Sequence, residues 1–575
     1  MRKCYPNVKE REEVAITMQE LAGIFQCSGR NVNLVLRRME ETAWIRWIPG
    51  RGRGNSSRMV FLIPAEEVAL ETAQGLVEKG DIQQAFAFLE EQSHLPSVKD
   101  RFVYWLDTHF GFHPEVRGKQ RSDILRSPYS KPIRCLDPAL LTYVVEAHLG
   151  QQIFDCLVKY NAKTDEIEGG LAHYWTVCDK GLHWTFYLRK GVYFHHGREM
   201  TAEDVRFTLE RLKGEELRSP HRWLFSGVES VEVRDKYIIR LKLRRANPLF
   251  LYHLSFERAA IVPEDAVRRL GENFRQMPVG TGPFRIVQHN ESMLVLEAFS
   301  RYYDKRSHLD RVEVWYTPEL LRKASSVESP PYLMRIQDCK ELTSGEIPQD
   351  WKVIEAVGRD SSFLTFNLNL PGPQQQLSFR KAFIHGVDRK KLIPPGEEDK
   401  TALSRWFYAL DQDLSSTDEQ YDPILARRYL AESGYAGETL TLLTSDAAWF
   451  TGAARELATQ LAELGIVIEI QPFRSGEDRL EQIAAAHFSL IRNVLDHNLA
   501  LSVIELFQSE VSCSLRTHLG TELREQTDWL IDRLYQEGSQ VTREGYLRRL
   551  QNLIQEEAYV FFLFQHTRGL YSIRL

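Results

Sequence analysis

The sequence lacks the long apolar run that a membrane span requires. Its longest compact apolar stretch, Ala558 to Phe564, is far shorter than the roughly 18 residues that cross a bilayer and is typical of a buried strand. The first residues, MRKCYPNVKEREE, include basic side chains but neither an apolar core segment nor a small-residue cleavage site. We therefore expect a globular protein of the cytoplasm that makes no membrane contact.

Cysteine is scarce, and catalytic motifs are missing. The seven cysteines are odd in number, widely scattered and never arranged as C-x-x-C, which argues against a disulfide framework and against a zinc site. No G-x-S-x-G, H-E-x-x-H or P-loop pattern occurs in the sequence. We expect no enzymatic activity, no cofactor and no metal ion.

The length and the charge distribution indicate several domains. A chain of 575 residues exceeds what one hydrophobic core supports. Residues 1–63 contain eleven Lys and Arg against six Glu, a net charge of +5, whereas the whole chain carries −6. A basic segment in front of an acidic remainder is typical of a protein that binds a polyanion at one end.

Residues 17–39 predict two short helices joined by a tight turn. Thr17 and Glu20 form a capping box for the first helix, and Ser28 is the N-cap candidate of the second. One face of the second helix is apolar, with Val32, Val35, Leu36 and Met39. The other face carries Arg30, Asn31, Asn33, Leu34, Arg37 and Arg38. An apolar docking face opposite Arg and Asn side chains is what a DNA recognition helix requires.

A basic hairpin follows these helices. Residues 44–48 and 58–62 predict two strands, and the connecting sequence PGRGRGNSS carries Arg51 and Arg53, with Arg58 at the start of the second strand. This arrangement resembles the wing of a winged helix, where glycine lets the backbone approach DNA and arginine meets phosphate or the minor groove. Paired amphipathic helices alone are common, so the basic hairpin is what favours DNA binding. Such domains begin with a further helix, which residues 1–16 leave short or incomplete.

We predict three domains from these patterns. Residues 1–63 form an α+β winged helix-turn-helix, and residues 64–118 form a helical linker that serves as a spacer or as a dimer contact. A polar segment rich in Gly and Pro near residue 118 marks the next boundary. Residues 119–575 form the remaining domain.

The third domain resembles the extracellular solute-binding proteins of the peptide and nickel transporter class. Characteristic strings occur in family order: LRKGVYFHHGREMTAEDV from Leu188, VGTGPFRI from Val279, FLTFNLNL from Phe363 and SFRKAFIHGVDRKKL from Ser378. The resemblance covers roughly residues 125–570. It implies a two-lobed α/β fold of the periplasmic-binding-protein type (class II), with a first lobe at about 119–360 plus the extreme C-terminus and a second lobe at about 361–560.

The combination of a winged helix with this domain resembles the SgrR family of transcriptional regulators, which respond to sugar-phosphate stress. The resemblance implies double-stranded promoter DNA as one partner and a small molecule in the interlobe cleft as the other: a sugar phosphate, another sugar metabolite or a peptide. Two alternatives stay open: a transporter-type solute-binding protein, and a cytoplasmic ligand-binding module without DNA binding. The sequence also leaves open whether the protein is a homodimer.

Candidate ligand-binding residues come from the same resemblance. Peptide-binding relatives carry a W-x-x-D-type stretch, and the corresponding FSLIRNVLDHNLAL here has no Trp. Asp496 holds the acidic position and Arg492 lies near the missing aromatic residue, where an arginine favours an anionic ligand. A surface ion pair is the alternative interpretation of both residues.

Aromatic and histidine residues add two further hypotheses. Tyr129 and Trp406 are candidates for the walls of the cleft, with core packing as the alternative. His195 and His196 are adjacent, so on a strand they point to opposite faces, and no carboxylate cluster adjoins them. We interpret both histidines as structural.

Overall fold

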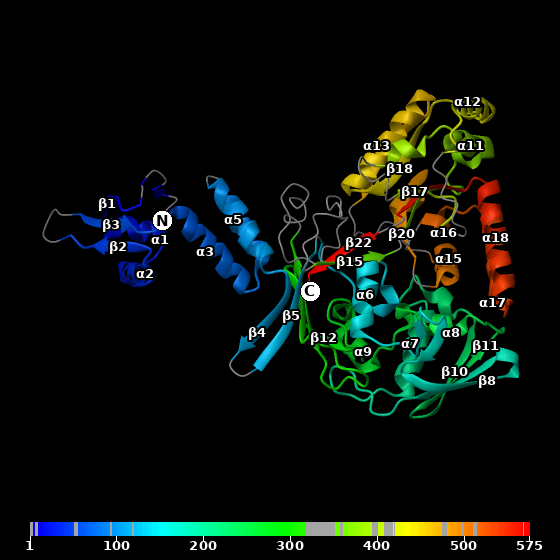
Figure 1. Cartoon of the computed structure of the whole chain (residues 1–575), viewed down its shortest axis with the longest axis horizontal. Helices are drawn as coiled ribbons and strands as arrows, with labels where there is room; N and C mark the ends of the chain where they lie inside the picture. Colours follow the sequence, from blue (N-terminus) through cyan, green and yellow to red (C-terminus); the bar gives the residue numbers. More distant parts are fainter. Residues whose placement is uncertain are drawn as a thin grey trace. The chain divides into compact units, whose positions relative to one another are not determined.

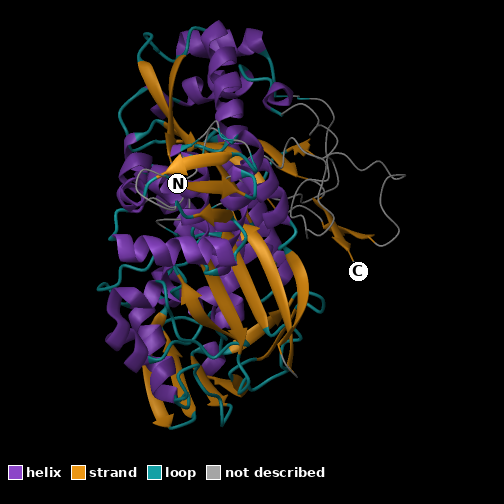
Figure 2. Ribbon diagram, turned by 90° about the vertical axis from the view of Figure 1, so that its left-hand side faces the viewer, coloured by secondary structure: helices purple, strands orange, loops and turns teal. Residues whose placement is uncertain are grey.

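The protein consists of two compact units in a computed structural model (Figure 1). One unit comprises Met1–Pro132, Gln288–Val295 and Arg311–Leu333; the other comprises Ile133–Val287, Leu296–Asp310 and Met334–Leu575. The structure describes residues 4–5, 8, 10–50, 56–92, 95–117, 120–129, 131–317, 351–356, 360–393, 401–407, 418, 420–473, 480–495, 498–509, 514–566 and 569–574. Both units contain helices and strands, which Figure 2 shows in separate colours.

The first unit begins with a winged helix-turn-helix, as the sequence predicts. Its elements are β1 (Glu13–Ile16), α1 (Met18–Phe25), α2 (Gly29–Glu41), β2 (Ile45–Ile48) and β3 (Ser57–Phe61). The three strands form an antiparallel sheet in the order β1-β3-β2. All five elements contribute buried side chains to one core: Ile16, Leu21, Val32, Leu36, Ile45, Met59 and Phe61. Strand β1, which the sequence did not reveal, directly precedes α1.

The start and the end of α1 follow from local chemistry. The capping box at Thr17 is confirmed: its hydroxyl accepts a hydrogen bond from the Glu20 amide, and the Glu20 carboxylate accepts one from the Thr17 amide. The hydrogen bonds that the Thr17 amide and hydroxyl donate to the Glu20 carboxylate lower the pKa of that carboxyl group. Gln26 ends α1 in the left-handed conformation, which turns the chain sharply toward α2.

The predicted helical segment packs onto a sheet. Helices α3 (Ala65–Glu78), α4 (Ile82–Glu91) and α5 (Pro96–Asp107) precede β4 (Gly111–Arg117) and β5 (Gln120–Tyr129). Strand β5 pairs in parallel with β14 (Arg311–Tyr316) in a five-stranded sheet of order β12-β13-β14-β5-β4, which includes β12 (Phe284–His289) and β13 (Met293–Ala298). The helices bury Phe86, Phe102 and Leu106 against Met293 and Trp315. These helices therefore belong to the same compact unit as the winged helix, and the exact domain limits stay predictions.

The second unit contains an antiparallel sheet and a mixed sheet. The antiparallel sheet has the order β10-β11-β9-β8 and is built from β8 (Ala172–Cys178), β9 (His183–Leu188), β10 (Val228–Asp235) and β11 (Ile238–Leu243). The mixed sheet has the order β17-β21-β16-β20-β18-β19. Its strands are β16 (Asp360–Phe366), β17 (Thr401–Leu403), β18 (Thr439–Ser445), β19 (Val467–Phe473), β20 (Phe488–Val494) and β21 (Val560–His566). Two-stranded pairs are formed by β6 (Val158–Asn161) with β7 (Glu166–Gly169), and by β15 (Trp351–Ala356) with β22 (Gly569–Arg574).

Helices cover these sheets and share their cores. They are α6 (Val144–Ile153), α7 (Ala202–Lys213), α8 (Phe250–Ser255), α9 (Glu264–Leu270), α11 (Leu377–His385), α12 (Pro423–Glu432), α13 (Ala448–Glu463), α14 (Leu480–Ala485), α15 (Leu499–Gln508), α16 (Ser514–His518), α17 (Thr521–Gln536) and α18 (Gln540–Glu556). One large apolar core joins residues between 139 and 261 to residues between 495 and 562. A second core fills the space around the mixed sheet, where α13 packs on β18 and β19.

A buried ion pair fixes the edge of the mixed sheet. The Arg389 guanidinium is 2% exposed and bonds the Asp418 carboxylate, with Nη2 2.6 Å from Oδ1. Its Nη1 also donates to the carbonyl oxygens of Ser404 and Phe562. Burial raises the pKa of the Asp418 carboxyl group, but the hydrogen bonds and charge of Arg389 outweigh it and hold that pKa below its usual range.

Candidate nucleic-acid interface and ligand-binding domain

Helix α2 has one buried and one exposed face. Val32 and Leu36 are buried against α1 and the small sheet. The polar side chains predicted for DNA contact are all exposed: Ser28, Arg30, Asn31, Asn33, Arg37 and Arg38. Ser28 precedes α2 in an extended conformation, and its side chain makes no capping hydrogen bond within the described part of the chain. Its hydroxyl can therefore reach an external acceptor such as a phosphate.

Two of the predicted arginines form exposed ion pairs. Arg37 Nε lies 3.2 Å from Glu41 Oε1, and Arg58 Nη1 lies 2.8 Å from Glu13 Oε2. Exposed pairs of this kind contribute at most about 1 kcal/mol and weaken with salt, so both guanidinium groups can exchange a carboxylate for a phosphate. Arg30 and Arg38 have no ion-pair partner among the described residues.

Leu34 gives the exposed face of α2 an apolar element. Its side chain is 62% exposed and lies between the arginines along the helix. An apolar side chain on such a face suits contact with a thymine methyl group in the major groove.

The wing is defined by its two strands. Ile48 pairs with Arg58 at the end of the β2–β3 ladder. The chain between them carries Arg51 and Arg53, which lie outside the described residues. Arg46 on β2 and Arg58 on β3 are both exposed. The cationic side chains of the strands therefore accompany those of α2 in the same small domain.

A side-chain hydrogen bond links the winged helix to the next helix. Trp44 Nε1 donates to Glu71 Oε2 on α3 at 3.3 Å. Gln83 on α4 in turn donates from Nε2 to the carbonyl oxygen of Tyr316 on β14 at 3.2 Å. Contacts within this unit therefore run from the winged helix to α3 and from α4 to the sheet.

The four candidate ligand residues lie in different surroundings. Tyr129 is the last residue of β5 in the first unit and is partly buried. Trp406 belongs to the second unit, where its 2% exposed ring packs against Phe407 and Phe562. The structure therefore places Trp406 in a core. Asp496 lies outside the described residues.

Arg492 forms an ion pair, the alternative interpretation given from the sequence, with a carboxylate that the sequence did not identify. Its Nε forms an ion pair with Oδ2 of Asp360, which is buried, while the Arg492 side chain is 39% exposed. The pair joins neighbouring strands, because Arg492 on β20 lies opposite Ser362 on β16. Arg492 is on β20, whereas Trp406 follows β17, and strands β16 and β21 lie between β20 and β17 in the sheet.

A buried charge cluster connects distant segments of the second unit. Arg258 Nη1 lies 2.5 Å from Glu257 Oε1, and Arg258 Nε forms an ion pair with Glu505 Oε1 on α15 at 3.0 Å. His221 Nδ1 lies 3.7 Å from the same Glu505 oxygen. Burial, reinforced by the charge of Arg258, keeps the pKa of His221 well below its usual value, so this imidazole is neutral. The cluster was not visible in the sequence because its members lie up to about 280 residues apart.

His195 contacts the glycine turn at Gly280 and Gly282, whereas His196 contacts Asp265. His195 Nε2 donates to the Gly282 carbonyl at 3.0 Å, and the Gly280 amide donates to His195 Nδ1 at 3.3 Å. Burial lowers the pKa of His195 to about 4. A Cβ on Gly280 would lie 2.0 Å from the carbonyl oxygen of Ile153, so only glycine permits this close approach. His196 bonds Asp265 at 2.9 Å.

Two regions of the chain match known protein families. Residues 166–498 match the bacterial extracellular solute-binding proteins, family 5 (middle part). Residues 3–105 match the N-terminal domain of the sugar transport-related sRNA regulator.

Similar proteins align with most of this chain or with about half of it. The uncharacterized protein YhjP of Bacillus subtilis is 30% identical over 96% of this chain and 91% of its own length. The HTH-type transcriptional regulators SgrR of Photorhabdus laumondii and Pectobacterium atrosepticum are 30% and 32% identical over 54% and 53% of this chain. These alignments span about half of each SgrR protein, 53% and 51%.

Solved structures show the fold. The periplasmic binding protein DppA of Helicobacter pylori, in complex with the peptide STSA, has a TM-score of 0.65 at 21% identity and covers 78% of this chain and 94% of its own. The oligopeptide-binding protein AppA of Bacillus subtilis, in complex with a nonapeptide, has a TM-score of 0.64 at 17% identity and covers 80% of this chain and 95% of its own. Among the described residues, every helix is too short or too polar to cross a bilayer. The chain thus belongs to the family 5 solute-binding proteins and carries the N-terminal domain of SgrR-type regulators in front of that fold.

Proposed function

We propose that this protein is a DNA-binding transcriptional regulator whose solute-binding domain senses a small molecule. The observation that carries the proposal is the exposed face of α2, where arginine and asparagine side chains stand opposite a buried apolar face. The names of the SgrR relatives support it, as does the match of residues 3–105. Because bacterial DNA is in the cytoplasm, the proposal places the protein there.

The geometry of the winged helix suggests how DNA is held. Helix α2 enters the major groove, where Asn31 and Asn33 reach base edges and Arg30 and Arg38 reach bases or phosphates. Ser28 at the helix start contacts a phosphate. The wing arginines contact the backbone or the adjacent minor groove. Phosphate contacts supply most of the affinity, and the base contacts supply the sequence preference.

The solute-binding domain supplies the signal. Its ligand is a sugar phosphate, another sugar metabolite or a peptide, and Arg492, whose side chain is 39% exposed, is the proposed contact for an anionic group. Ligand binding can change DNA affinity only if the ligand binds two states of the protein unequally. The hydrogen bonds from Trp44 to Glu71 and from Gln83 to Tyr316 support a path through the helices of the first unit.

Recovery of genomic fragments tests the proposal. The purified full-length protein is incubated with fragmented genomic DNA, with and without sugar phosphates, free sugars or peptides, and the bound fragments are sequenced. We expect enrichment of a few promoter regions, and a change in that enrichment with one class of metabolite. A variant with Arg30, Arg37 and Arg38 replaced by Ala should lose the enrichment.

The alternatives make different predictions in the same experiment. A transporter-type solute-binding protein, or a ligand-binding module whose winged helix contacts another protein, would enrich no promoter above the triple variant. That result would refute the proposed function.

A further inference from the structure

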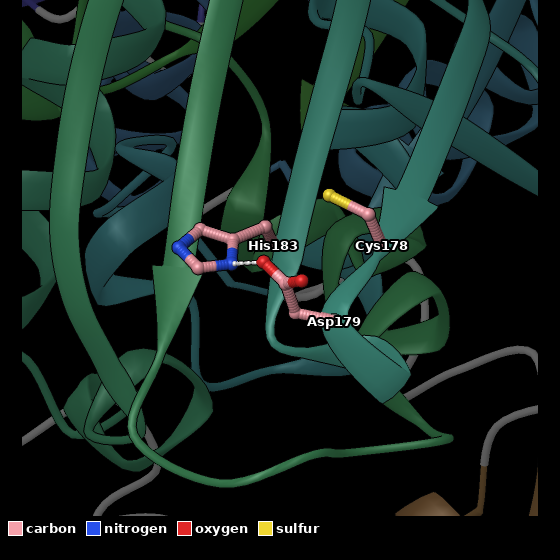
Figure 3. A group of neighbouring side chains, drawn as sticks. All are labelled: Cys178, Asp179 and His183. Atoms are coloured by element: carbon pink, nitrogen blue, oxygen red, sulfur yellow. Dashed lines mark ion pairs between the residues drawn. The ribbon is translucent and has the colours of Figure 1, made fainter.

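The turn between β8 and β9 brings a thiol, a carboxylate and an imidazole together (Figure 3). Cys178 and His183 are cross-strand partners in the β8–β9 ladder, so their side chains leave the sheet on the same face. Asp179, the next residue after Cys178, has a φ of 52°. This left-handed conformation turns its carboxylate toward His183 instead of toward the opposite face.

The three side chains offer a compact set of metal-ligand atoms. One atom from each of Cys178, Asp179 and His183 lies within 4.8 Å of the other two. Bonds of about 2.0–2.3 Å to a zinc ion place two ligand atoms roughly 3–4 Å apart. Small side-chain rotations would therefore suffice to enclose one ion.

The imidazole is not held by an aligned hydrogen bond. His183 Nδ1 lies 2.6 Å from Asp179 Oδ2, yet this buried nitrogen has no hydrogen bond of acceptable geometry within the described part of the chain. Cys178 is an exposed free thiol. An Asp–His ion pair would account for two of the residues but not for the thiol beside them.

The backbone of the turn is fixed before any ion binds. The Leu182 amide donates to the Asp179 carbonyl, and Trp184 Nε1 donates to the Gly181 carbonyl at 3.0 Å. The Trp184 ring is anchored in the core, where it stacks on Phe186. A rigid turn of this kind lowers the entropic cost of gathering the ligands.

The surrounding charges permit a divalent cation. Lys242 on β11 lies opposite His183, but its ammonium group is paired with Glu229 at 3.0 Å. Lys180 lies in the turn itself. A thiolate and a carboxylate together carry two negative charges, which a divalent ion neutralises.

We propose that Cys178, Asp179 and His183 bind a divalent transition-metal ion of the zinc class. Thiolate, imidazole and carboxylate are the side-chain ligands that Zn²⁺ uses, and three of them leave one position for water or an external ligand. On binding, the Cys178 thiol releases its proton to solvent and the neutral His183 ring coordinates through Nδ1. The site uses none of the residues assigned above to DNA or ligand binding.

The test uses the untagged, reduced full-length protein and two probes. Zn²⁺ affinity is measured by competition with a chromophoric chelator, and Co²⁺ is added separately to detect a thiolate-to-metal charge-transfer band. The variants are Cys178→Ser, Asp179→Asn and His183→Gln. Asparagine tolerates the left-handed backbone of residue 179, so that change removes the charge and keeps the turn. The matched control is Cys4→Ser, which removes another exposed free thiol.

We expect the wild type and Cys4→Ser to bind one Zn²⁺ at the site and to show the Co²⁺ band. Each ligand variant should bind Zn²⁺ at least about tenfold more weakly, and Cys178→Ser should lose the band. Thermal unfolding without metal shows whether each variant is folded. If folded ligand variants bind Zn²⁺ as tightly as the wild type, or if the Co²⁺ band persists in Cys178→Ser, the proposal is overturned.

Discussion

Removing the arginines of α2 should change the salt dependence of DNA binding in a calculable way. Arg30, Arg37 and Arg38 are exposed on one helix, so replacing all three with Ala should leave the fold intact. Each phosphate that a cationic side chain neutralises contributes about 0.9 to the slope of log K against log salt concentration. If all three arginines contact phosphates, the negative slope should therefore become shallower by about 2.7 in the triple variant.

Fluorescence anisotropy with a recovered promoter duplex at several salt concentrations measures this slope. A matched control is Arg268→Ala on α9. The Arg268 guanidinium forms an ion pair with Glu264, one turn earlier, at 2.7 Å, and the Arg268 side chain is 72% exposed, close to the 79% of Arg37. The control should keep the wild-type slope. An unchanged slope in the triple variant would refute the assignment of α2 to the DNA interface.

Three further predictions concern the wing and the buried charges. Replacing Arg51 and Arg53 with Ala should make the negative salt slope shallower by up to about 1.8, measured in the same assay. Burial lowers the pKa of His253 to about 4 from the usual 6.5, so the unfolded chain binds more protons between these values. The free energy of unfolding should therefore decrease as the pH drops from 6.5 toward 4, and this residue should account for a decrease of roughly 2 kcal/mol at pH 5. Denaturant titrations at pH 7 and pH 5 should show a smaller loss of stability for His253→Gln than for the wild type. Asp418→Asn leaves the buried Arg389 charge without its partner and should destabilise the fold by about 3–5 kcal/mol. The assay is denaturant unfolding, in which the midpoint should be lower than that of the wild type. An unchanged midpoint would contradict this interpretation of the pair.

Local patterns in the sequence predicted local structure well. The capping box of Thr17 and Glu20, the two helices and the strands of the wing all appear where their residues indicate. Each depends on interactions within a few residues, so the sequence contains the needed information. Strand β1 was missed because its partner β3 lies more than forty residues later, and four residues give no clear alternation by themselves.

The candidate ligand residues show the opposite case. Arg492 and Trp406 were selected by position relative to a family pattern, which says nothing about side-chain partners. The structure supplies a buried carboxylate, Asp360, for Arg492 and a cluster of aromatic rings for Trp406. The ligand role of both residues stays a prediction.

The sequence alone determined the class of each domain, because helical and strand periodicity, caps and family strings are written in neighbouring residues. Only the tertiary structure decided which distant groups meet: Arg258 with Glu505, Arg389 with Asp418, and the helices after the wing with Trp315. Even Cys178 and His183, five positions apart, become neighbours only through the register of one hairpin. These contacts depend on chain topology and strand register. Topology and register are set by the burial of whole apolar surfaces and not by any short stretch of residues.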